Sequence, residues 1–295
     1  MKIAHIVPCR DKAEHLHYSV GSVLNQTHKV DVILSDQGSK DGSLKVLKRM
    51  KEQDSGKNNI TILECPETDP KGMHGLNTHM NWIIDSTDYD LYIMTAADDW
   101  AHPERNEKVI KAYEEHKPDV VLTSMQFIET TGEVGGITMH PETDGFIDPI
   151  YCLEKLIGGS TSHAWSREFW KFAQPIDPIS SYDGYLVFLA TMRRGAYMLI
   201  EPLHAYIRHK SLDNTGLEGV YRASSEKEQK RVEELMHFQV LSGYVTALEK
   251  YESWGLDHDK AKITLYEHII GKAIMWSKAR RELSLNRVAP SSLKS

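Results

Sequence analysis

Residues 1–125 alternate between short apolar runs and longer segments with helical spacing, which restricts the fold more than any other feature of the chain. The apolar runs, rich in β-branched residues, cover residues 3–7, 30–34, 60–63, 91–94 and 120–122. The segments with helical spacing cover residues 15–24, 43–51, 76–84 and 106–116. Strands that alternate with helices predict βαβ units, so the expected fold class is α/β with a mostly parallel central sheet flanked by helices.

The composition is that of an ordinary globular protein. The chain has 295 residues, of which 40% are hydrophobic and 26% are charged, and its formal net charge is −7. These values exclude an intrinsically disordered chain and a fibrous repeat. The length is sufficient to bury a substantial core without disulfides.

The cysteines and the apolar segments bear on the compartment. Cys9, Cys65 and Cys152 are odd in number and far apart, so they form neither a disulfide framework nor a Cys-x-x-Cys metal site. A reducing compartment is therefore expected. The N-terminal apolar run is too short for a signal peptide, and no stretch approaches the ~18 apolar residues of a membrane span. We expect a cytoplasmic protein.

The character of the sequence changes twice along the chain. Residues 126–208 are less regular than the residues before them, and residues 225–251 and 257–283 have the spacing of two long amphipathic helices. We therefore expect one domain over residues 1–218, with halves at 1–125 and 126–218, and a helical extension over residues 219–295.

The end of the chain is basic although the whole chain is acidic. Residues 271–295 carry six Lys and Arg residues against the single acid Glu282. One interpretation is a packed helix whose charges are solvated. The other is a contact with a polyanion such as DNA, or with an anionic membrane surface.

Acidic residues follow three of the predicted strands. Asp11 follows the first strand, Asp36 the second, and Asp98 with Asp99 the fourth. In a parallel sheet with right-handed crossovers the carboxyl ends of the strands meet at one rim, where ligands bind. The sequence therefore predicts that these acids lie together at a binding site.

Two of these positions suggest a particular chemistry. Asp98 and Asp99 repel each other, so a cation or hydrogen-bond donors must stabilise the pair, and Mg²⁺ or Mn²⁺ shared with phosphates suits carboxylate oxygens. Alternatively, Asp99 caps the next helix. Asp36 ends a strand before a Gly-Ser turn, where a carboxylate can accept hydrogen bonds from a nucleobase or a ribose.

Several motifs in their order along the chain resemble family 2 glycosyltransferases with the GT-A fold. The stronger matches are residues 6–11, 19–27, 36–43, 75–81, 97–99 and 103–105, and the weaker ones are residues 181–184 and 206–209. The resemblance covers about residues 1–215. It implies a Rossmann-like nucleotide-sugar-binding half at 1–125, an acceptor half at 126–218, and an extension outside the family pattern.

The resemblance implies an inverting, metal-dependent transfer from a nucleotide sugar, typically UDP-linked, to an acceptor hydroxyl. Asp183 would be the catalytic base, and Asp99, with Asp98 and His209, would hold Mn²⁺ or Mg²⁺. The other donor-binding residues that it implies are Pro8, Asp11, Asp36, Asn81 and Arg208. Alternatively, Asp183 is a helix N-cap, which Ser180 or Ser181 could equally provide.

The sequence departs from the family pattern at three positions. Ala97 stands at the first acid of the usual D-x-D, Gln37 at the acid beside Asp36, and Met80 at an arginine that pairs with the diphosphate. The residues that could replace this arginine are Lys71, His74, His79, Arg208 and Lys210.

The acceptor and two alternative functions stay open. His163 and Trp165 could line an acceptor pocket or pack structurally, and the acceptor could be a saccharide, a lipid, a small molecule or a polyanion such as modified DNA. A nucleotidyltransferase would need a glycine-rich loop after the first strand, where this chain has Arg10 and Lys12 but no glycine. The other alternative is a non-catalytic nucleotide-sugar-binding protein on a degenerate transferase scaffold.

Overall fold

The computed structural model describes residues 1–66, 74–129, 131–137, 141–155, 162–174, 182–208, 243–247, 249–250 and 267. Most of the predicted extension at 219–295 and of the basic segment at 271–295 therefore lies outside the described residues. The elements in order are β1 Ile3–Cys9, α1 Leu16–Leu24, β2 Asp31–Asp36, α2 Ser43–Asp54, β3 Ile60–Glu64, α3 His74–Asp85, β4 Leu91–Met94, β5 Trp100–Ala101, α4 Arg105–His116, β6 Val120–Glu129, β7 Val134–Ile137, β8 Gly145–Phe146, α5 Pro149–Lys155, β9 His163–Ser166, α6 Arg167–Ala173, α7 Tyr182–Thr191 and β10 Ala196–Arg208.

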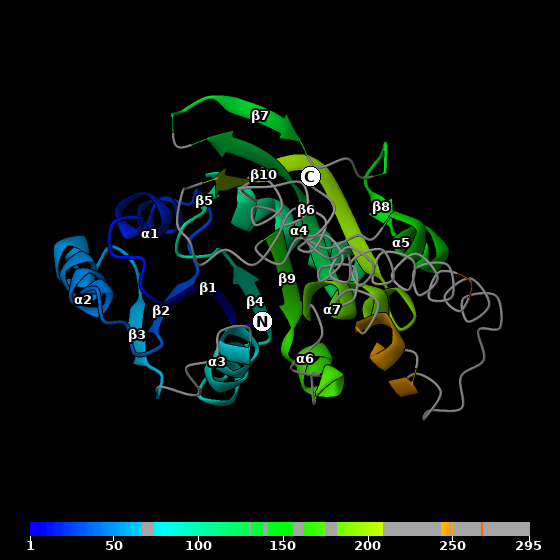
Figure 1. Cartoon of the computed structure of the whole chain (residues 1–295), viewed down its shortest axis with the longest axis horizontal. Coiled ribbons are helices and arrows are strands. Elements are labelled where there is room, and N and C mark those ends of the chain that lie inside the picture. Colours follow the sequence, from blue (N-terminus) through cyan, green and yellow to red (C-terminus); the bar gives the residue numbers. More distant parts are fainter. Residues whose placement is uncertain are drawn as a thin grey trace, which may run out of the picture.

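The described strands form one central sheet in the order β3-β2-β1-β4-β9-β6-β10-β5 (Figure 1). Strands β1 to β4 are parallel to one another, as predicted, and β10 is parallel to β6. Strand β9 lies between β4 and β6 and is antiparallel to both. The fold is therefore α/β as expected, but the whole sheet is mixed because β9 and the short strands β5, β7 and β8 run antiparallel.

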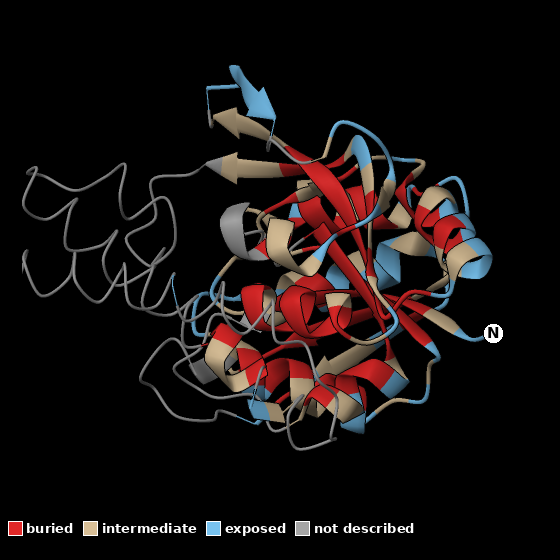
Figure 2. Ribbon diagram, turned by 90° about the vertical axis from the view of Figure 1, so that its right-hand side faces the viewer, coloured by how far each residue is buried: buried red, intermediate tan, exposed pale blue. Residues whose placement is uncertain are grey.

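Alternate residues of the strands face two separate helix layers. Val7, Val32 and Leu34 pack with α1 and α2, and Leu91 and Ile93 pack with α4. The residues between them face α3, α6 and α7; these are Ala4, Ile6, Ile33, Tyr92, Met94, Leu122 and Trp165. Figure 2 shows the resulting buried band through the sheet, with exposed residues on the outer sides of the helices. Side chains that alternate with period two explain why the apolar runs are continuous, since both faces of this sheet are covered.

The N-terminal elements match the sequence prediction closely, whereas the second half does not. Residues 126–208 hold the longest strand, β10, and the central strand β9, neither of which was predicted. The pairing of β10 with β6 shifts register around Pro202, and Glu201, Pro202 and His204 interrupt its apolar pattern. A bulged strand with polar insertions lacks the alternation on which strand prediction depends.

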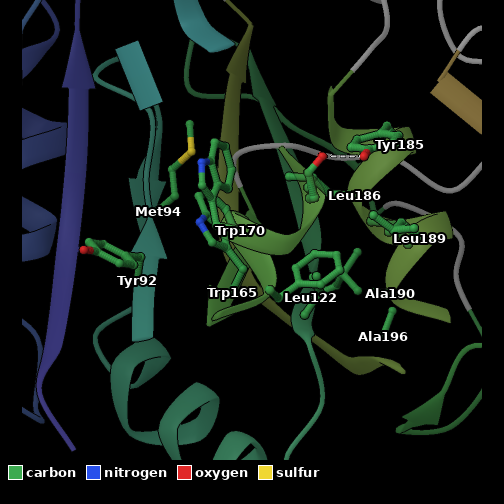
Figure 3. Packing of buried hydrophobic residues seen from close by; sticks show 14 of the residues in the cluster. Tyr92, Met94, Leu122, Trp165, Trp170, Tyr185, Leu186, Leu189, Ala190 and Ala196 are labelled. Atoms are coloured by element: carbon green, nitrogen blue, oxygen red, sulfur yellow. Dashed lines mark hydrogen bonds between the residues drawn. The ribbon is translucent and has the colours of Figure 1, made fainter. Parts of the chain in front are cut away.

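Helix α7 is buried on all sides and runs opposite to β4. Each residue from Tyr185 to Ala190 is fully buried. In Figure 3, β4 leads from Tyr92 up to Met94, whereas α7 leads from Tyr185 down to Ala190. The N-terminal end of α7 therefore points toward the edge of the sheet at which β1 and β4 end, and Asp183 belongs to the first turn of this helix.

All three cysteines are free and buried. Within the described ranges, no helix combines the length and the apolar character that crossing a bilayer requires.

Gly195 offers a test of the second half of the sheet. Its φ is +103°, and an added Cβ would lie 2.4 Å from Cδ1 of Phe146. We expect Gly195→Ala to lower the free energy of unfolding by about 1–2 kcal/mol because an L-residue is strained at positive φ. Urea unfolding measures this change. Gly21→Ala is the control, since Gly21 lies in α1 and an added Cβ there would meet nothing within 4 Å; equal effects of the two variants would contradict the strain.

Candidate active site

Two loops interlock where β1 and β2 end. Ser39 Oγ accepts from the backbone N–H of Asp11 at 2.9 Å, and Asp11 Oδ1 accepts from the N–H of Lys40 at 2.7 Å. Ser43 Oγ accepts from the N–H of Lys12 at 2.9 Å, and Asp41 Oδ2 accepts from the N–H of Ala13 at 2.8 Å. Asp11 has a φ of +51°, which is uncommon for a residue other than glycine. These bonds fix the backbone of the loop after β1.

Asp36 lies buried at the carboxyl end of β2. Its Oδ2 accepts from the N–H of Ser39 at 3.0 Å. Its Oδ1 is buried and has no hydrogen-bond partner within the part of the chain that the structure describes. A buried carboxylate oxygen without a donor is costly, and buried polar atoms of folded proteins are normally paired. The position therefore suits a ligand that brings an N–H group.

Asp98 lies in a turn that helix α1 supports. Ser19 Oγ donates to the carbonyl oxygen of Ala97 at 2.8 Å, and the hydroxyl of Tyr18 donates to the carbonyl oxygen of Asp98 at 3.2 Å. The Asp98 side chain is 16% exposed, and its Oδ2 lies 2.7 Å from Nζ of Lys12. Burial raises the pKa of Tyr18, and Asp98 and Asp99 add to this shift. The carboxylate of Asp98 is thus partly accessible and already paired with a cation.

Asp99, although adjacent in sequence, has a different environment. It is 1% exposed, its Oδ2 lies 3.0 Å from Nε2 of His204, and its Oδ1 accepts from the N–H of Ile207 at 3.1 Å. Both oxygens therefore hold β10 to the turn after β4. The sequence predicted Asp99 as the direct metal ligand, which stays a prediction; of the two side chains, that of Asp98 is the more accessible.

A buried hydrogen-bond chain continues from Asp99 into the protein. Nη1 of Arg105 lies 3.2 Å from Nδ1 of His204 and 2.6 Å from Oγ1 of Thr95. Since a guanidinium only donates, Nδ1 of His204 accepts, and its Nε2 must carry the proton that it donates to Asp99. Burial lowers the pKa of His204, and Arg105 lowers it further, which agrees with a neutral imidazole. Burial also lowers the pKa of Arg105 to about 9, while Asp99 opposes this shift.

The chain has a second branch on the other side of Thr95. His5 Nε2 lies 2.8 Å from Oγ1 of Thr95, and His5 Nδ1 lies 2.7 Å from Oδ1 of Asn106. Asn106 is itself buried, and its backbone N–H donates to Oε1 of Gln26 at 2.9 Å. The buried network therefore joins β1, α4 and β10 with the segments that follow β4 and α1.

The structure brings some of the predicted site residues together and separates others. Pro8, Asp11, Asp36, Asp98 and Asp99 lie on or directly after the ends of β1, β2 and β4. Asp183 is half-buried at the start of α7. Burial and Cys152 raise the pKa of Tyr244, and the charge of Asp183 adds to this shift, so Asp183 lies near Tyr244.

Other predicted residues lie elsewhere. Oδ1 of Asn81 accepts from Nε1 of Trp170 at 2.9 Å, so this amide is bound to α6. His163 and Trp165 are fully buried in β9, which argues against the predicted acceptor contact. Trp165 instead stacks on Trp170 with ring centroids 5.1 Å apart. The backbone of Arg208 ends β10, and His209 lies outside the described residues.

The residues at the rim could hold a divalent ion only together with ligands from the substrate. Across the described ranges, no three His, Cys, Asp or Glu side chains gather at one point that could hold a metal. Mg²⁺, however, is commonly held by one or two carboxylates together with substrate phosphates. Asp98 can supply one such carboxylate, whereas both oxygens of Asp99 are engaged.

His79 is one of the residues predicted to replace the family's diphosphate-binding arginine, where this chain has Met80. It is buried, and its Nε2 lies 2.7 Å from Oγ of Ser35. Met80 itself is fully buried in the core. Lys71 and Lys210 lie outside the described residues. The sequence gives no sign that His5, Arg105 and His204 form a buried network, because nothing in the local pattern distinguishes a buried polar residue from a surface one.

The fold and the acidic rim define a GT-A-type glycosyltransferase. The sequence model described as glycosyl transferase family 2 matches residues 5–168, and the chain belongs to this family. No curated protein matches the sequence.

Solved structures support the fold. The chain is similar to S. aureus TarS in complex with UDP-GlcNAc, with a TM-score of 0.58 and 18% identity over 86% of this chain and 73% of that chain. It is also similar to the mannosyltransferase PcManGT from Pyrobaculum calidifontis in complex with GDP-Man and Mn²⁺, with a TM-score of 0.53 and 14% identity over 96% of this chain and 83% of that chain. The GT-A fold expected from the sequence is thereby confirmed.

The buried network predicts a large effect of removing its charge. Arg105→Met leaves Nδ1 of His204 and Oγ1 of Thr95 without their donor and Asp99 without the opposite charge, so we expect a loss of about 3–5 kcal/mol in the free energy of unfolding. Lys108→Met, on the same helix, removes exposed ion pairs with Glu104 and Glu201 and should change stability little. Denaturant unfolding of both variants measures the difference, and an Arg105→Met protein as stable as the wild type would refute the role of the network.

Proposed function

We propose that this glycosyltransferase binds a UDP-linked sugar at the rim formed by β1, β2 and β4 and transfers the sugar with inversion to an acceptor hydroxyl. The observation that carries the proposal is Oδ1 of Asp36, which is buried at that rim with no partner among the described residues. The ring N–H of a uracil is a donor that would satisfy this oxygen. The nucleotide-sugar complexes of TarS and PcManGT, which share this fold, support a donor of this class.

Asp98 is the residue that we assign to the diphosphate end of the donor. Its carboxylate is the more accessible of the acid pair and lies in a turn held by α1. A bound Mn²⁺ or Mg²⁺ would neutralise charge on the departing diphosphate. Asp99 then has an indirect part, because its bonds to His204 and Ile207 hold the turn that carries Asp98.

Asp183 is the residue that we assign to proton transfer. The N-terminal end of α7 points toward the edge of the sheet at which β1 and β4 end, so a carboxylate there can approach a donor bound at the rim (Figure 3). A general base on the face opposite the leaving group would take the acceptor proton as the hydroxyl attacks, which inverts the anomeric centre.

The nucleotidyltransferase alternative has less support. Its phosphate loop would depend on glycines after the first strand. Here the loop after β1 turns through Asp11 instead, and side chains of the next loop take up its N–H groups. The polyanionic acceptor predicted from residues 271–295 concerns a segment outside the described residues and stays a prediction.

Donor binding can be tested with a panel of UDP and GDP sugars in Mn²⁺, scored by thermal shift and by slow donor hydrolysis. We expect UDP sugars to stabilise the protein. Asp36→Asn should weaken UDP binding roughly tenfold or more, because the substitution replaces a charged acceptor with a neutral one. Asp31→Asn, at the opposite end of the same strand, is the control. Absence of a shift with any nucleotide would refute the proposed donor class.

Asp183→Asn tests the catalytic base separately from donor binding. We expect UDP affinity to be retained while transfer falls by roughly 10²–10⁴-fold, the usual contribution of a general base. Glu168→Gln, at the start of α6, serves as a control acid in surface ion pairs. Since the acceptor is unidentified, donor hydrolysis by water gives the rate; an unchanged rate in Asp183→Asn would exclude this carboxylate as the base.

A further inference from the structure

Lys12 is unusual among the lysines that pair with carboxylates. Its Nζ lies 2.7 Å from Oδ2 of Asp98, and its side chain is only 19% exposed. The side chains of Lys2, Lys48 and Lys108, which also pair with carboxylates, are between 34% and 68% exposed. An ion pair withdrawn from water is screened less than one on the surface, so the ammonium of Lys12 has a strong local effect.

The backbone around Lys12 is held in place by the neighbouring loop. Its own N–H donates to Oγ of Ser43, and the N–H groups on either side donate to Ser39 and Asp41. The positive φ of Asp11 directs the chain into this arrangement. The loop therefore holds the backbone of Lys12 beside Asp98, which limits the conformational entropy lost when the ion pair forms.

The ammonium of Lys12 changes the charge that a diphosphate would meet at the rim. A diphosphate carries negative charge and is repelled by a bare carboxylate at Asp98. The family pattern meets this charge with a divalent ion held by two acids, but Ala97 replaces one acid and the oxygens of Asp99 are engaged. Lys12 already neutralises Asp98 before any ion or nucleotide binds.

We propose that Lys12 is a donor-binding residue that neutralises Asp98 for the incoming diphosphate and so makes nucleotide binding only weakly dependent on a divalent cation. This inference rests on the proposed function, since it concerns the same rim. It assigns to the loop after β1 a charge that a metal ion alone would otherwise supply.

The test compares UDP and GDP binding by calorimetry, with EDTA or with Mn²⁺, in the wild type and in Lys12→Met. We expect the wild type to bind nucleotide in EDTA, and Lys12→Met to lose roughly tenfold or more in affinity there, with Mn²⁺ restoring most of the loss. Lys12→Arg should behave as the wild type because it keeps the charge. Lys48→Met, which removes an exposed lysine paired with Glu64, is the matched control.

A second readout does not involve nucleotide. Mn²⁺ alone, followed by electron paramagnetic resonance, should bind more tightly to Lys12→Met than to the wild type, because the carboxylate of Asp98 no longer has a competing ammonium. Thermal unfolding of each variant confirms that it is folded.

Three outcomes overturn the inference. In the first, Lys12→Met binds nucleotide in EDTA as well as the wild type does. In the second, the wild type needs Mn²⁺ as strongly as Lys12→Met does, which leaves the proposed function intact. In the third, the wild type binds neither UDP nor GDP with or without Mn²⁺, and the proposed function then fails together with the inference.

Discussion

A guanidinium with no access to solvent is the constraint around which this molecule is organised. Arg105 is fully buried, and such a charge is tolerated only when hydrogen bonds and an opposite charge compensate it. His204 hydrogen-bonds to both Arg105 and Asp99 and so links the guanidinium to the opposite charge. Thr95 connects the same guanidinium to His5. His204 satisfies both of its ring nitrogens in this arrangement, because Nδ1 accepts from Arg105 and Nε2 donates to Asp99. The network thus fixes where the turn after β4 lies relative to β10.

The same constraint explains why two adjacent acids differ. Asp99 faces inward, where it serves the buried charge, and Asp98 faces the rim, where Lys12 meets it. Neighbouring carboxylates in contrasting surroundings commonly take separate tasks. Here one carboxylate holds the scaffold in position and the other is available to a ligand, so the rigidity of the first determines the placement of the second.

The fold and the acids at the rim could be predicted from the sequence because both depend on local patterns. Continuous apolar runs such as residues 91–94 indicate strands covered on two faces, and Asp36 follows its strand directly. The contributions of His204 and Arg105 could not be predicted, since they depend on contacts between residues 99 positions apart. For a related reason, the sequence left both an acceptor contact and structural packing open for His163 and Trp165: a four-residue strand after a loop has too few residues to show a period.

The central position of β9 has a consequence for how the chain acquires its structure. Residues 163–166 fill the gap between β4 and β6, which precede them by some 40 to 70 residues. During synthesis the inner edges of both neighbours are therefore complete but unpaired until this short segment leaves the ribosome. Open edges of apolar strands are templates for wrong association. The insertion of these four residues closes the opening between β4 and β6, and the other edge of β6 stays open until β10 follows.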